Sequence, residues 1–467
     1  MSAIQHNMKK AGLLVCWLFI ISSCTKFVEI DPPKTETIVG PKVFTNDVDA
    51  TGAVIGVYGE MIHSSGFAGG YTQSITFLSA LSADELTNYS GQSVPRQFYE
   101  NAISVNNAAI ERSLWNEGYR YIYAANRVLR GLQTSSGVSA ATKSQLIGEA
   151  QFIRAFCHFY LVNLFGAVPL ITSTDYEVNM IKPRTSVDSV YKQIIADLRN
   201  AQSLLRNDYV DGQKVRPNKA TATAFLARVY LYRKDWANAG QQASLLINDP
   251  AYRLNDTLNE VFLQNSAEAI WQLVPNMPTY NTWEGANFIL TAAPAVSSVN
   301  ATALSPELLA AFEPGDLRRT NWVDSITVDT NQYFFPYKYK VKRSDYLTEY
   351  SMVLRLAEQY LIRAEARAQR GNFLGARSDL NMLRRRAGLP PAIANTLAAM
   401  LRAITHERQV ELFTEWGHRW LDLKRTNTAA AVLSHIKPAW KNTAVLYPLP
   451  QNELAKNPLL GAQNEGY

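Results

Sequence analysis

Two segments of this chain repeat one pattern of small and aromatic residues, and this repeat constrains the fold more than any other feature. In the first segment, Ala227 is followed nine residues later by Trp236. In the second, Ala364 is followed nine residues later by Phe373. A short polar turn precedes each aromatic residue, and the small residues let two helices approach closely. The pattern predicts two helix-turn-helix pairs of tetratricopeptide type, with an ordinary helical hairpin as the alternative.

Helical periodicity extends over most of the rest of the chain. Segment 186–205 is the clearest example, because its apolar residues recur at spacings of three and four. Thr185 or Ser186 is expected to cap its start. In another apolar segment, 146–165, we expect Arg154 to pair with a carboxylate or a carbonyl inside the helical bundle. These segments indicate a mainly α-helical protein.

The residues between the two repeats, 251–350, differ in composition from the rest. Proline, asparagine and threonine are frequent there, and aromatic residues are dense without helical spacing. Two stretches, 268–274 and 333–341, have the character of short strands. We interpret this segment as a loop-rich, aromatic-rich insertion on a helical scaffold, and we expect a second such stretch at 66–106. Loops on a rigid scaffold are where binding residues usually lie.

The first 24 residues have the order of a secretory signal. Lys9 and Lys10 form a short positive region, an apolar run follows from residue 11 to residue 21, and small residues precede Cys24. Such a run spans about 16 Å as a helix, little more than half of the hydrocarbon layer. The pattern therefore predicts a signal peptide, residues 1–23, and not a mature membrane span. A buried N-terminal helix is the alternative.

Composition and motifs argue against several classes of function. The net charge of +6 is spread over 467 residues without a long basic run, so nucleic acid is not expected as a partner. Three cysteines are too few for a disulfide framework or a thiolate metal site. The sequence has no glycine-rich nucleotide loop, nucleophile elbow or metal-binding histidine pair. We therefore predict neither a cofactor nor a metal.

One cluster of carboxylates could supply a catalytic pair. Glu407, Glu411 and Glu415 recur every four residues, so they share a helical face and could provide the acid and base of a glycoside hydrolase. Several basic residues lie close by in sequence: Arg408, Arg419, Lys424 and Arg425. Because ion pairing with these neighbours is the simpler explanation, we expect a structural cluster and a protein that is not an enzyme.

Several stretches in a fixed order carry a resemblance to a known family. The longest are Ile404-Thr-His-Glu-Arg-Gln-Val-Glu-Leu412 and Glu415-Trp-Gly-His-Arg-Trp-Leu-Asp-Leu-Lys-Arg425. The others are residues 24–33, 148–155, 164–170, 216–222, 360–366 and 447–450. Together they resemble the SusD/RagB family of outer-membrane nutrient-binding lipoproteins of the Bacteroidetes, over almost the whole chain that follows the signal peptide.

The resemblance implies a fold and a localisation. The fold would be tetratricopeptide-like helical pairs that carry a loop-rich half with a few short strands. Cys24 would carry the lipid anchor and hold the protein on the outer membrane, facing the exterior, and stable anchoring takes more than one acyl chain. The implied division is 1–23 signal peptide, 24–44 lipidated N-terminus and tether, 45–250 N-terminal helical half, 251–350 insertion and 351–467 C-terminal helical half.

The resemblance also implies a function and partners. The protein would capture an oligosaccharide and deliver it to a SusC-like TonB-dependent transporter, over which it would sit as a lid. A purely protein-binding tetratricopeptide scaffold remains an alternative. A sugar site needs flat aromatic platforms beside amide, carboxylate or guanidinium groups. The candidate ligand-binding residues in the two loop-rich stretches are Asp84, Asn88, Tyr89, Tyr280, Trp283 and Asn287.

Overall fold

The structure is a computed structural model that describes residues 41–63, 67–69, 72–277, 279–295 and 300–467. The chain divides into two compact units, residues 1–43 and residues 44–467. The predicted signal peptide and Cys24 lie outside the described residues. In the part of the chain that is described, no helix is long and apolar enough to cross a membrane.

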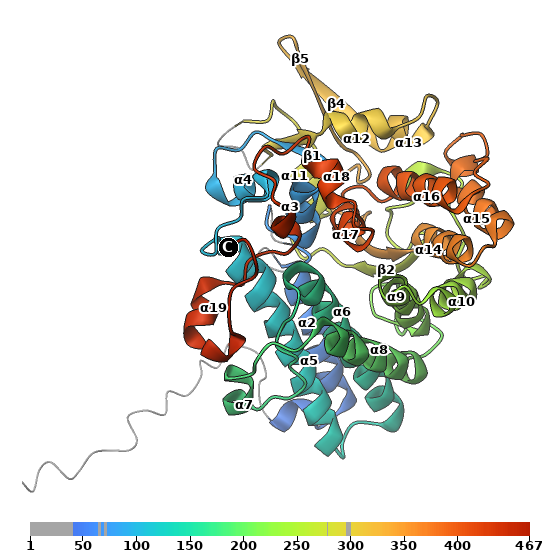
Figure 1. The fold of residues 1–467 in the computed structure, drawn as a ribbon. Coiled ribbons are helices and arrows are strands. Elements are labelled where there is room, and N and C mark those ends of the chain that lie inside the picture. The colour runs from blue at the N-terminus through green and yellow to red at the C-terminus, as the bar shows by residue number, and fades with distance from the viewer. Residues whose placement is uncertain (1–40, 64–66, 70–71, 278, 296–299) are drawn as a thin grey trace, which may run out of the picture. The chain divides into compact units, whose positions relative to one another are not determined.

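Long helices form the scaffold of the second unit, and consecutive helices of this scaffold pack against one another (Figure 1). The series passes from α5 through α6, α8, α9 and α10 to α14, α15 and α16. Their bounds are α5 Glu117–Thr134, α6 Ala140–Phe165, α8 Val187–Leu204, α9 Lys219–Tyr232, α10 Trp236–Ile247, α14 Leu356–Gln369, α15 Phe373–Arg386 and α16 Leu397–Glu411. The expected mainly helical fold is confirmed.

Helix α8 shows how local sequence sets these elements. Ser186 caps it, because the serine hydroxyl accepts a hydrogen bond from the backbone N–H of Ser189 at 3.3 Å. Val190, Ile194 and Leu198 then lie on one buried face. The helix predicted at 186–205 is therefore confirmed within one residue at each end.

Helix α6 is largely buried, and Arg154 lies within it. The Arg154 guanidinium donates to both carboxylate oxygens of Asp197, at 2.8 and 2.6 Å, and to Oδ1 of Asn126 at 2.8 Å. A buried charge persists only where it is paired in this way. The expected pairing of Arg154 inside the bundle is confirmed.

The two repeated segments form the helical hairpins α9–α10 and α14–α15. At each turn a short side chain caps the second helix, Asp235 in the first hairpin and Asn372 in the second. The hairpins pack together through α10 and α14 although the insertion separates them in sequence. A Cβ at Gly240 on α10 would lie 3.4 Å from Cβ of Ala366 on α14, so small residues do permit the close approach. The hairpins are confirmed, and their tetratricopeptide character stays an interpretation.

Three antiparallel two-stranded sheets hold the loop-rich part. They pair β1 Leu86–Asn88 with β3 Thr302–Leu304, β2 Ala269–Leu273 with β6 Ser351–Arg355, and β4 Val323–Val328 with β5 Asn331–Pro336. The strand predicted at 268–274 is confirmed as β2. The one predicted at 333–341 begins two residues earlier and ends at Pro336, which has no N–H to continue a ladder. Beyond it Lys338 turns inward, and its ammonium group donates to the backbone carbonyls of Glu411 and Phe413.

Helix α2 and a set of shorter elements complete the described residues. The α-helices are α2 Asp47–Ile62, α3 Ile75–Ser82, α4 Ser93–Glu100, α7 Tyr176–Met180, α11 Trp283–Phe288, α12 Pro306–Ala311, α13 Leu317–Asn321, α17 His418–Arg425, α18 Ala429–Leu433 and α19 Gln451–Lys456. A π-helix, η2 Ala109–Asn116, leads into α5, and 3₁₀ turns lie at η1 Pro41–Phe44, η3 Leu258–Glu260, η4 Asn442–Val445 and η5 Pro458–Leu460.

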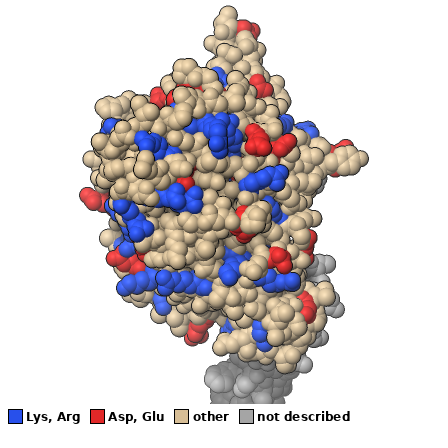
Figure 2. All heavy atoms as spheres, turned by 90° about the vertical axis from the view of Figure 1, so that its right-hand side faces the viewer, with Lys and Arg blue, Asp and Glu red and all other residues tan. Residues whose placement is uncertain are grey.

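Basic side chains are dispersed over the face that carries α10 and α15. Figure 2 shows them in separate groups, with other residues and some Asp and Glu between them. A nucleic-acid interface would instead gather Lys and Arg into a continuous stripe or patch. On this face the distribution of charge agrees with the expectation drawn from composition.

Candidate functional site

Tyr89 and Tyr333 come together although 243 residues separate them in the chain. The β1–β3 ladder ends at Asn88, and the N–H of Tyr89 continues it with a hydrogen bond of 2.8 Å to the carbonyl of Ala301. Strand β3 in turn packs against β5, which carries Tyr333. The two rings meet edge to face, with centroids 5.6 Å apart and planes at 83°. We call this pair the tyrosine platform.

The platform faces solvent and has polar neighbours. Tyr89 keeps 38% of its surface exposed, and Tyr333 is half-buried. Burial raises the pKa of Tyr89, and Tyr333 and Tyr99 of α4 raise it further, so its hydroxyl stays protonated at neutral pH. Asn88 forms a local turn, because its side chain exchanges two hydrogen bonds of 3.2 Å with the backbone of Ser90. The platform thus combines a partly exposed ring with hydroxyl donors.

Hydrogen bonds connect the segment that holds Tyr89 to Asn287. Asn300 donates from its side-chain amide to the backbone carbonyls of Asn287 at 2.6 Å and Ala286 at 2.9 Å. Asn300 is adjacent to Ala301, which holds Tyr89. Asn287 is itself 4% exposed. The sequence-predicted Asn287 therefore anchors the segment that positions Tyr89, and its side chain has almost no surface facing solvent.

Trp283 lies inside the protein, at the start of α11. It is 3% exposed, and its indole N–H donates to the backbone carbonyl of Ile62 at 2.7 Å. The absence of helical periodicity around Trp283 suggested a loop residue free to reach a ligand, but a six-residue helix capped by Thr282 holds it inward. Trp283 thus fastens its segment to the end of α2.

Tyr280 stays half-buried, and Arg343 holds it. The Arg343 guanidinium donates to the Tyr280 hydroxyl at 2.9 Å and lies 5.0 Å from the centre of its ring. This geometry is a cation–π contact reinforced by a hydrogen bond. Tyr280 therefore presents an aromatic ring beside a guanidinium, which is the combination expected of a sugar-binding residue.

Asp84 has a structural role, because it pairs with Arg419 of α17. Both carboxylate oxygens of Asp84 accept from Arg419, at 2.7 and 2.6 Å, and Asp84 is 4% exposed. Its neighbour Glu85 is buried too, and burial together with the Asp84 charge raises the pKa of Glu85 to about 8. Of the six predicted residues, Asn88 and Tyr89 lie at the platform, Tyr280 lies on another loop, and the other three are buried.

The glutamate cluster is fully buried and saturated with cations. Arg318 binds Glu407 at 2.5 Å and Glu411 at 3.0 Å, and Arg355 binds Glu411 at 2.6 Å. Arg355 also binds Glu415 at 2.8 Å, and Lys338 binds Glu415 at 2.5 Å. Burial alone would raise the pKa of Glu411, but three surrounding guanidinium groups outweigh it and hold that pKa well below its ordinary value.

The structural role expected for the cluster is confirmed, but the expected partners are wrong. Instead of binding the cluster, Arg408 pairs with Asp422, and Arg425 pairs with Asp422 and Glu365. The partners of the glutamates come from β6, α13, α15 and the segment after β5 because tertiary packing brings these elements to α16. An acid held ionised cannot donate a proton to a glycosidic oxygen. Among the described residues no group of His, Cys, Asp and Glu could hold a metal ion.

Sequence reasoning placed Tyr333 in the aromatic insertion but did not select it as a site residue. Its neighbours in sequence are also aromatic, so nothing local distinguishes Tyr333 from Phe334 or Phe335. Phe335 is 3% exposed, whereas Tyr333 meets Tyr89. Alternation along β5 puts Phe334 on the opposite face from Tyr333 but Phe335 on the same face, so no local signal separates Tyr333 from Phe335.

Two family models match this chain. Residues 69–231 match a model described as starch-binding and associating with the outer membrane, and residues 318–467 match a model of the SusD family. SusD-like protein P25 of Formosa agariphila is 26% identical, over 98% of this chain and 100% of the relative. A SusD-like protein of Bacteroides ovatus is 34% identical, over 27% of this chain and 23% of the relative.

Solved structures share the fold. A SusD superfamily protein of Bacteroides vulgatus aligns with a TM-score of 0.79 and 21% identity, and surface glycan-binding protein A of Bacteroides fluxus with 0.75 and 22%. A laminarin-binding SusD-like protein aligns with 0.74 and 25%. Each alignment covers 91% of this chain and 100% of the other. The last two names describe binding proteins, and the expectation that this chain is not an enzyme agrees with them.

Proposed function

The chain belongs to the SusD/RagB family, a family of carbohydrate-binding proteins, and on this premise we propose that it captures an oligosaccharide at the tyrosine platform. The pairing of Tyr89 with Tyr333 carries the proposal. Two loop-rich stretches that are remote in sequence meet there and leave an aromatic surface in solvent. The apolar C–H face of a sugar ring packs against such a surface, and its hydroxyl groups reach neighbouring donors and acceptors.

Binding of neutral oligosaccharides to platform variants tests this proposal. Isothermal titration with laminari- and malto-oligosaccharides should show binding by wild type, and Tyr89→Ala and Tyr333→Ala should each weaken it about five-fold, since an aromatic contact contributes roughly 1 kcal/mol. Tyr176→Ala is the matched control, because Tyr176 on α7 is 72% exposed and lies outside the platform. Unchanged affinity in both platform variants would remove the platform from the site.

Delivery to a transporter is the second part of the proposal. The bound sugar passes to a SusC-like TonB-dependent transporter, over which the protein sits as a lid, and acyl chains on Cys24 hold it on the outer membrane, facing the exterior. The family resemblance supports both statements. Affinity capture of the tagged protein from detergent-solubilised outer membranes should recover a TonB-dependent transporter, and recovery of none would contradict delivery.

Cys24→Ser should abolish fractionation with the outer membrane. If the variant still fractionates with the outer membrane, the proposed lipid anchor is refuted.

A further inference from the structure

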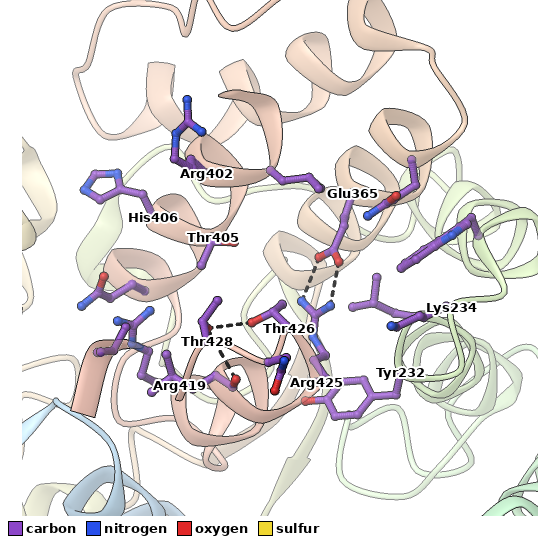
Figure 3. Close-up of a pocket in the computed structure, with 18 residues that line it drawn as sticks. Tyr232, Lys234, Glu365, Arg402, Thr405, His406, Arg419, Arg425, Thr426 and Thr428 are labelled. Carbon is purple, nitrogen blue, oxygen red and sulfur yellow. Dashed lines mark hydrogen bonds and ion pairs between the residues drawn. The ribbon is translucent and has the colours of Figure 1, made fainter. Parts of the chain in front are cut away.

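A cleft of about 730 Å³ opens in the helical scaffold, away from the tyrosine platform. Its walls come from the α9–α10 turn, α14, α16, α17 and the start of α18 (Figure 3). No residue of the platform lines it. Its volume lies within the range of small-molecule sites, which is roughly 300–1,000 Å³. The family comparison and the tyrosine platform leave this cleft without a role.

The walls of the cleft carry more positive than negative charge. Arg425 is neutralised by Glu365, at 2.7 and 2.8 Å, and Arg419 is neutralised by Asp84. Lys234 and Arg402 have no ion-pair partner among the described residues. Figure 3 shows these two side chains on opposite sides of the cleft, with the Glu365–Arg425 pair between them. Two unneutralised cations therefore line a space large enough for a ligand.

One wall is aromatic. Tyr232 and Trp236 line it, and the Arg425 guanidinium lies 5.5 Å from the centre of the Tyr232 ring. The Tyr232 hydroxyl is buried and has no hydrogen-bond partner in the part of the chain that is described. Thr405 and Asn427 add a hydroxyl and an amide to the lining. The cleft thus offers flat apolar surface, uncharged hydrogen-bonding groups and surplus positive charge.

We propose that this cleft is a second carbohydrate site, specific for an acidic sugar that carries a carboxylate or a sulfate group. The aromatic wall packs against the C–H face of the ring, and the threonine and asparagine side chains meet its hydroxyl groups. Lys234 on one side of the cleft and Arg402 on the other each bind an anionic group of an oligosaccharide built from such sugars. A neutral sugar would leave both cations without a partner, and a simple inorganic anion would leave the aromatic wall uncovered. The site is independent of the platform proposed above.

Titration of the protein with two acidic trisaccharides and one neutral trisaccharide tests the inference. Trigalacturonate supplies carboxylates, a sulfated trisaccharide supplies sulfate esters, and maltotriose is the neutral counterpart. In the variant Tyr89→Ala, which removes the platform, at least one acidic trisaccharide should still bind, and its affinity should fall as salt is added. The double variant Lys234→Gln, Arg402→Gln should weaken this binding about ten-fold.

A charge-matched variant distinguishes binding by the cations of the cleft from attraction by the overall electrostatic field of the protein. Arg112→Gln, Lys192→Gln removes the same charge from two exposed positions outside the cleft, and it should bind the acidic trisaccharide like wild type. Trp236→Phe should retain binding if it folds, which near-UV circular dichroism verifies. Equal losses in the two double variants, binding of hexaglutamate as tight as that of the acidic sugars, or no binding of either acidic sugar would overturn the inference.

Discussion

Individual arginines hold this protein together at its most deeply buried positions. Arg355 is 2% exposed and binds Glu268 at 2.8 Å, Glu411 at 2.6 Å and Glu415 at 2.8 Å. It thereby connects the insertion to α16 and to the segment that follows it. Removing one partner of a buried ion pair costs about 3–5 kcal/mol, because the other charge stays buried without compensation. These arginine side chains therefore connect segments of the fold through ion pairs and do not serve as catalytic groups.

Glu85 should make stability depend on pH. Its pKa is about 8 in the folded protein, above the value of 4.5 expected when unfolded, so the folded state binds this proton more tightly. That contribution is fully present below pH 4.5 and is lost as the pH rises through 8, a change on the order of a few kcal/mol. Glu85→Gln keeps a carbonyl for the N–H of Thr414 and cannot ionise. Its stability relative to wild type should therefore increase from pH 5 to pH 8.

Urea denaturation at several pH values measures this difference. Glu177→Gln is the control, because Glu177 is exposed on α7 and should leave the pH dependence of wild type unchanged. If Glu85→Gln follows wild type in parallel over the whole range, Glu85 does not titrate as described.

The start of a helix can depend on the backbone conformation of a single residue. The turn before α17 is the clearest case in this protein. Gly417 begins the helix with φ of +69°, in the left-handed region that favours glycine. A Cβ at this position would also lie 2.8 Å from both Cβ and Oγ of Ser79 on α3. The turn places α17 against α3, and the Asp84–Arg419 pair lies at this contact.

Gly417→Ala should therefore destabilise the protein by more than conformational strain alone. Gly212 has nearly the same φ, +68°, but its Cβ would meet nothing within 4 Å. Gly212→Ala isolates the cost of the backbone conformation, about 1 kcal/mol, whereas Gly417→Ala adds a clash of about 1–3 kcal/mol. Thermal denaturation of both variants measures the cost of the backbone conformation and the added cost of the clash. Equal losses would show that α3 and α17 move apart freely.

At the scale of the whole molecule, residues 44–467 form one compact unit even though the insertion divides the helical scaffold. Helix α10, before the insertion, packs against α14, after it. Arg228 of α9 binds Glu358 of α14 at 2.7 and 2.6 Å, and both residues are 1% exposed. The segments 45–250 and 351–467 thus share one core and do not form separate modules.

Unfolding should accordingly be cooperative across both segments. Calorimetry of the chain from residue 44 should show a single transition, and the isolated segment 45–250 should lack one, because it would expose the α10 face that α14 covers. Glu358→Gln should lower the temperature of that transition without splitting it, since it leaves Arg228 buried beside a neutral group. Two resolved transitions in the intact chain would contradict the shared core.

The sequence by itself determined the helix at 186–205 with its serine cap, the two helical hairpins and the structural character of the glutamate cluster. These follow from local chemistry, because a 3.6-residue period and a capping serine act within a few residues. Only the tertiary structure decided which aromatic residues reach solvent and which arginines meet the glutamates. Trp283 and Tyr89 both lie in sequence segments without helical periodicity, yet contact with Ile62 buries the first, while the β1–β3 ladder exposes the second beside Tyr333. Such contacts join residues that are hundreds of positions apart, so no local pattern encodes them.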